Sequence, residues 1–157
     1  MSQQADYSPE EWKTISAAPI MAGLLVSMSD LSGPVGMAKE AIAVVRSVTE
    51  SASTSTNELI KAVSGGITAK GGKPEMPNLP ADRASVLSNL VDGCRQAAAI
   101  VSQKSPGEAA EYKRWLVSLA QKTAEASKEG GFLGIGGTLV SDAESSAVKQ
   151  LSSALGV

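Results

Sequence analysis

Few of the side chains that commonly carry enzyme chemistry are present in this sequence. It contains no histidine, which removes the commonest general base, every Ser-His or Cys-His nucleophile pair and most transition-metal sites. Cys94 is the single cysteine, so neither a thiolate zinc site nor a disulfide can form within the chain, and we expect a reducing, cytoplasmic setting. Any catalysis would depend on carboxylates, lysines or hydroxyl groups.

Two pairs of glutamates have a spacing that could bind a hard cation. Glu108 and Glu111 are three residues apart, and Glu125 and Glu129 are four apart, so each pair shares one face of a helix. Paired carboxylates can hold a metal ion. More often, such residues interact with the helix dipole or with neighbouring lysines on a solvated face. We therefore assign no catalytic residue, no metal site and no cofactor, and favour a protein that is not an enzyme.

The densest cluster of glycines, GGFLGIGG at residues 130–137, has three possible roles. A phosphate-binding loop of the Walker type requires GK[ST] after a strand, but Thr138 follows the last glycine directly. A membrane-inserting tip could use Phe132, Leu133 and Ile135, although no basic face flanks them. We favour a buried corner between two helices, whose first glycines end one helix. This candidate corner comprises Gly130, Gly131, Phe132, Leu133, Gly134, Ile135, Gly136 and Gly137.

Three serines, each followed by glutamate three residues later, predict helix starts. They are Ser8, Ser105 and Ser141. In such a capping box the serine oxygen accepts from a backbone N–H of the first turn, and the glutamate reaches back to the N–H of the cap residue. Proline follows Ser8 and Ser105, which suits the first helical position because no donor is needed there.

Apolar residues at helical spacing predict a compact all-α bundle and no strands, in a single domain over residues 1–157. We expect a bend near Pro19, a loop over the small polar residues 50–57, and the end of a short helix at Gly65 and Gly66. A long irregular connection is expected over residues 65–81, which hold several glycines and prolines. The roughly six expected helices span residues 9–28, 34–49, 57–63, 82–101, 106–128 and 142–155.

Charge and hydropathy exclude two classes of partner. The 14 basic and 16 acidic residues are nearly balanced and the basic ones form no run, so no nucleic-acid footprint is present. The longest apolar stretch, residues 17–28, contains a proline and is shorter than the roughly 20 residues that span a bilayer. We expect no integral membrane segment. Cys94 lies on an apolar helical stripe with Leu90 and Val101, which predicts a buried and inert thiol.

The spacing of tryptophan and glycine suggests an internal duplication. Trp12 precedes Gly33 by 21 residues and Trp115 precedes Gly136 by 21, and each tryptophan follows a capping box. The residues between them match poorly, so chance is an alternative explanation. We interpret the pattern as two pseudo-repeated helical hairpins.

The segments SGPVGMAKEA and EASKEGGFLGIGGTLVSDAE resemble a family of small uncharacterised bacterial proteins. The likeness covers residues 8–50 and 105–156. More distantly, the paired-hairpin organisation is similar to the helical tellurite-resistance TerB-like fold, although the acidic metal cluster of that group has no counterpart here. The resemblance implies helices and a cytoplasmic setting, and it implies no activity.

Two functions of different classes remain. The first is a non-enzymatic interaction module that self-associates as a homo-oligomer or docks to a protein partner through the small-residue faces at 17–28 or 96–101. The second is a binder of a small apolar or acidic ligand in a cavity between the hairpins. The expected lining of that cavity is Met21, Leu25, Met28, Met37 and Trp115. We favour the interaction module because the sequence holds no constellation of reactive groups.

Overall fold

The computed structural model describes residues 2–30, 33–71, 80–128 and 140–157; the side chains of residues 33–37 and 127–128 lie outside the description. These residues form a short 3₁₀ turn and six α-helices, and no strand occurs among them, which confirms the all-α prediction. The elements are η1 (Gln4–Asp6), α1 (Pro9–Ser29), α2 (Gly33–Thr54), α3 (Glu58–Ala69), α4 (Arg83–Lys104), α5 (Pro106–Lys128) and α6 (Asp142–Leu155).

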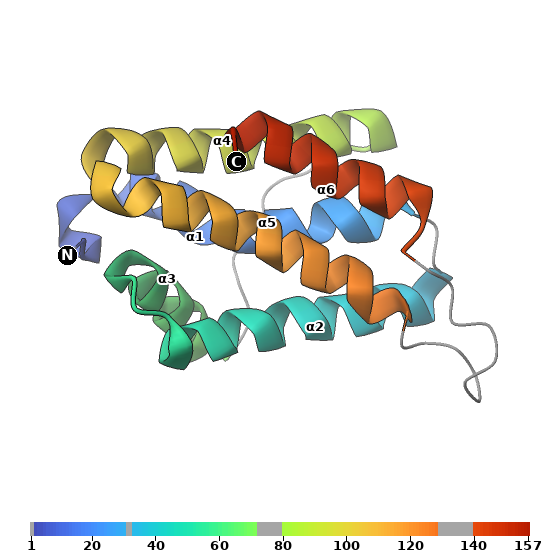
Figure 1. Cartoon of the computed structure of the whole chain (residues 1–157), viewed down its shortest axis with the longest axis horizontal. Helices are drawn as coiled ribbons and strands as arrows, with labels where there is room; N and C mark the ends of the chain where they lie inside the picture. The colour runs from blue at the N-terminus through green and yellow to red at the C-terminus, as the bar shows by residue number, and fades with distance from the viewer. Residues whose placement is uncertain (1, 31–32, 72–79, 129–139) are drawn as a thin grey trace.

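The helices form three layers. Figure 1 shows α1 and α5 in the middle of the molecule, between α4 and α6 on one side and α2 and α3 on the other. Helix α1 packs against each of the five other helices. Its second half is apolar all round, as a helix surrounded by others should be. Within each expected hairpin the two helices, α1 with α2 and α5 with α6, are in contact. Their duplication stays a prediction.

Two of the three expected capping boxes are present. The Ser8 hydroxyl accepts from Glu11 N while the Glu11 carboxylate accepts from Ser8 N at 2.7 Å, and Ser141 with Glu144 repeats this arrangement at the start of α6. The third pair, Ser105 with Glu108, is used differently.

The Ser105 hydroxyl and the Glu108 carboxylate bond to other parts of the chain. Ser105 Oγ lies 2.6 Å from Tyr7 Oη, and the two Glu108 oxygens accept from Ser2 N at 3.2 Å and from Leu59 N at 3.1 Å. The carboxylate therefore satisfies a free donor in the first turn of α3 rather than in its own helix. Local spacing cannot distinguish these outcomes, because the competing donors come from distant segments.

Helices α2 and α3 extend furthest beyond the ranges predicted for them. Helix α2 continues to Thr54, where serine and threonine hydroxyls bond back to carbonyls one turn earlier, as in Thr54 Oγ1 to Glu50 O at 2.8 Å. Helix α3 runs through Gly65 and Gly66 to Ala69. Each glycine costs about 1 kcal/mol in a helix relative to alanine. Burial of Ile67, which is worth roughly 1.5–3 kcal/mol, offsets that cost.

Pro19 lies inside α1, and a tyrosine from another helix repairs the hydrogen bond that it removes. Proline has no N–H, so the Ile15 carbonyl one turn earlier has no donor within the helix. The buried Tyr112 hydroxyl of α5 donates to Ile15 O at 2.8 Å. Helix α1 can thus continue through the proline, and α5 is held against it.

Candidate functional site

The side chains predicted to line a cavity mostly contribute to the core. Leu25 is fully buried, and Met21 and Met28 are partly buried against the core cluster. Trp115 is almost fully buried and its Nε1 donates to Ser51 Oγ at 2.9 Å. The fifth, Met37, has its side chain outside the described part of the chain, as does the whole candidate corner at residues 130–137.

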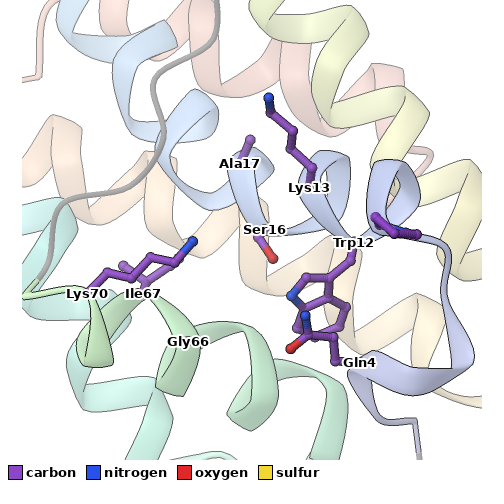
Figure 2. A pocket seen from close by; sticks show the side chains of 9 residues that line it. Gln4, Trp12, Lys13, Ser16, Ala17, Gly66, Ile67 and Lys70 are labelled. Atoms are coloured by element: carbon purple, nitrogen blue, oxygen red, sulfur yellow. The ribbon is translucent and has the colours of Figure 1, made fainter.

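A pocket of about 440 Å³ lies elsewhere, between η1, the first half of α1 and the last turns of α3. None of the four predicted residues whose side chains the structure describes lines it. Figure 2 shows its wall, with the side of α1 facing the end of α3. The lining residues are Gln4, Pro9, Trp12, Lys13, Ser16, Ala17, Gly66, Ile67 and Lys70.

The indole of Trp12 is the largest group of the lining, and its position is fixed by neighbours. The Tyr7 ring packs against it with 5.8 Å between ring centroids. Tyr7 is itself held by the hydrogen bond between its hydroxyl and Ser105, and the Lys104 ammonium lies 5.9 Å from its ring centroid. Lys104 is bonded in turn to Glu11, at 2.7 Å. This chain of contacts preorganises the aromatic wall of the pocket.

Three lining side chains, those of Trp12, Ser16 and Lys70, carry hydrogen-bond donors that border the same pocket. Lys70 follows directly after α3, and Gly71, with its left-handed backbone at φ 68°, turns the chain there. Figure 2 shows the Lys70 side chain reaching from this point towards α1, where the Ser16 hydroxyl lies. Lys70 forms no ion pair with any residue that the structure describes. Among the same residues, neither Ser16 Oγ nor Trp12 Nε1 has a hydrogen-bond partner.

The charge of the lining has one sign. Lys70 and Lys13 both belong to the lining, although Figure 2 shows the Lys13 ammonium directed away from Lys70 and Ser16; no aspartate or glutamate is among the lining residues that the structure describes. The pocket therefore combines a positive potential with apolar surface from Trp12, Ala17 and Ile67.

The candidate acidic pairs have structural partners or lie on the surface. Glu111 accepts from Asn57 Nδ2 at 3.0 Å, and Glu108 accepts the two backbone N–H groups described above. Glu125 is exposed and accepts from Gln121, whereas Glu129 is outside the described residues. Within residues 2–30, 33–71, 80–128 and 140–157, no group of three potential ligands could hold a metal ion.

Cys94 is a packing group, as predicted. Its side chain is fully buried, and its Sγ lies 3.6 Å from Ala18 O as a weak donor. Burial raises the pKa of the Cys94 thiol to about 12, because the thiolate would lose its hydration. The nucleophilic form is therefore nearly absent at neutral pH.

The sequence does not indicate the pocket, because its glycines predict too early an end for α3. Gly66 and Ile67 lie in the final turns of α3 and Lys70 follows directly, in a segment that the glycines and prolines of residues 65–81 predicted to be irregular. One signal was available on the other side: Trp12 and Ser16 are four residues apart and share a helical face. Only the position of α3 shows what that face borders.

Comparisons with protein-family models, with curated proteins and with solved structures find no match to this chain. In the described part of the molecule, no helix combines the length and the apolar character needed to cross a membrane.

Proposed function

We propose that the protein is a non-enzymatic binder of a small ligand, which occupies the pocket between α1 and α3. The observation that carries this proposal is a cavity of about 440 Å³ lined by a fixed indole and by two lysines, with no acidic side chain among its described lining residues. Ligand sites are commonly 300–1,000 Å³ in volume, largely preformed and apolar, with few polar groups that fix orientation. The pocket replaces the inter-hairpin cavity as the place where the ligand is expected.

The faces first considered for docking support this choice. In the segment 17–28, Ala18, Ala22 and Leu25 are buried within the chain, and Ala97 and Ala98 of the segment 96–101 are buried as well. Their small side chains serve close packing between helices of one molecule. Little of either face remains for a partner.

A retained ligand tests the proposal. Protein purified gently from its own host is measured by native mass spectrometry, and we expect a reproducible additional mass of a small molecule. In Gly66→Leu the new side chain projects into the pocket and should abolish this mass, because a side chain at position 66 meets open space. Gly65→Leu is the matched control: position 65 is also open and helical but does not line the pocket. Equal retention by both variants would place the ligand elsewhere.

A second function, self-association or docking to a protein partner, is favoured by one observation on α2. Ile42 is 68% exposed, the largest exposure of any large apolar side chain in the described chain. Isolated exposed apolar residues are common, so this proposal ranks second. We place either function in the cytoplasm, which the single buried thiol supports. We also propose that the chain belongs to the bacterial family that it resembles.

A further inference from the structure

We propose that the ligand of this pocket is an organic anion with an aromatic or other apolar body, bound by Lys70 at its charged end and by Trp12 and Ile67 along its body. This inference rests on the proposed function and specifies its ligand class. It depends on three properties of the lining: its charge, its apolar area and the direction of its donors.

The charge of the lining selects against cations and favours anions. Two other lysines have carboxylate partners: Lys104 lies 2.7 Å from Glu11 and Lys61 lies 3.0 Å from Glu58. The Lys70 ammonium forms no such pair in the described chain, although it reaches across the pocket towards α1 (Figure 2). An anionic group within reach of Lys70 would supply the missing carboxylate-like partner.

The donors near Lys70 suit oxygens that carry the charge. The half-buried hydroxyl of Ser16 and the indole Nε1 of Trp12 both lie on the α1 side of the pocket, and both can donate. An anion with two or three oxygens can accept from the ammonium and from these groups together. A neutral body without oxygens would leave the donors to water.

The apolar part of the lining indicates that the anion is not a bare inorganic ion. The partly buried Trp12 indole presents an aromatic surface that Tyr7 holds in place, beside Ile67, which is only 5% exposed. A free phosphate would leave this surface in contact with water and would occupy a small part of the 440 Å³. An aromatic or hydrocarbon body would cover it and gain the hydrophobic free energy of burial.

A matched pair of probes tests the inference. We use 8-anilinonaphthalene-1-sulfonate and N-phenyl-1-naphthylamine, which share one aromatic body and differ in the sulfonate. Dissociation constants are measured by isothermal titration calorimetry on the full chain. We expect the sulfonate to bind about tenfold more tightly, as one charge-assisted contact at a partly exposed site would give. Lys70→Met should remove this preference and leave the affinity for the amine nearly unchanged.

Control variants separate the inference from the proposed function. Lys61→Met makes the same chemical change on the same helix outside the pocket and should keep the preference for the sulfonate. Gly66→Leu should abolish binding of both probes, and Gly65→Leu should retain both. If both probes bind equally and only Gly66→Leu removes them, the pocket binds ligands but the anion inference is wrong. If neither probe binds, or if Gly66→Leu has no effect, the pocket is not a binding site and both proposals are overturned.

Discussion

At the scale of single residues, the chemistry of this protein is dominated by groups that complete each other's hydrogen bonds. Glu108 caps a turn of α3, and Tyr112 replaces a donor that Pro19 lacks. Burial raises the pKa of Tyr112 well above its usual value, so the phenol remains a donor far into the alkaline range. Glu108 and Tyr112 are both titratable, but each is bound to a structural partner and neither provides a reactive group.

The hydrogen bond from Tyr112 to Ile15 O predicts that substitutions at Tyr112 and Pro19 are energetically coupled. Tyr112→Phe leaves the Ile15 carbonyl buried without a donor and should lower the free energy of unfolding by about 1–3 kcal/mol. In a Pro19→Ala background the N–H of residue 19 can donate to the same carbonyl, so the Phe substitution should cost less. Urea denaturation of the four proteins gives the coupling energy. An identical cost in both backgrounds would show that the phenol does not replace the missing donor.

At the scale of elements, glycine sets how closely α1 approaches its neighbours. A Cβ at Gly23 would overlap the Val44 side chain of α2, and one at Gly93 would overlap the Met21 side chain of α1. Glycine is therefore required at position 23 by a β-branched neighbour, which is stiff. Methionine is flexible, so the contact at Gly93 can adjust. The close packing expected from abundant small residues is present at these crossings.

The effect of Gly23→Ala on the free energy of unfolding should change sign when Val44 is replaced by alanine. Gly23→Ala in the wild-type chain should destabilise the protein by about 1–3 kcal/mol through overpacking. In a Val44→Ala background the same change should stabilise it, because the new methyl group fills vacated space and improves helix propensity. Gly65→Ala is the control, since nothing lies within 4 Å of its Cβ, and should stabilise α3 by roughly 0.5–1 kcal/mol. Thermal or urea unfolding measures all of these. Destabilisation by Gly23→Ala in both backgrounds would contradict the proposed overlap.

At the scale of the whole molecule, the question is whether the chain acts alone. A binder with a pocket formed by η1, α1 and α3 needs no second copy. A second copy would have to cover an outer face, and on the described surface the exposed Ile42 of α2 is the best apolar contact.

The mass in solution decides between these arrangements. If α2 mediates self-association, native mass spectrometry should find a discrete oligomer, and Ile42→Glu should convert it to a monomer because a charge would be desolvated at the interface. Thr49→Glu is the control, since it adds the same charge at an exposed position about two turns away on α2. A monomeric wild type would overturn self-association and leave the binding proposal standing.

The sequence by itself determined the fold class, most helix starts and the inert character of Cys94. These depend on local interactions: Ser8 and Ser141 cap their own first turns, and the apolar spacing of Leu90, Cys94 and Val101 creates one buried face whatever covers it. The absence of histidine likewise needs no fold to be informative.

Only the tertiary structure decided where α3 ends, which groups complete α1 and where the pocket lies. Gly65 and Gly66 locally favour an end to the helix, and the burial of Ile67 against distant residues overrides them. Ser105 and Glu108 form a local capping pattern, yet donors about 50 and 100 residues away bind their side chains. Lys70 approaches Trp12 and Ser16 because α3 extends past its glycines and borders α1. The physical reason is common to all three cases: the free energy of contacts between segments distant in sequence exceeds the local preference of about 1 kcal/mol per residue.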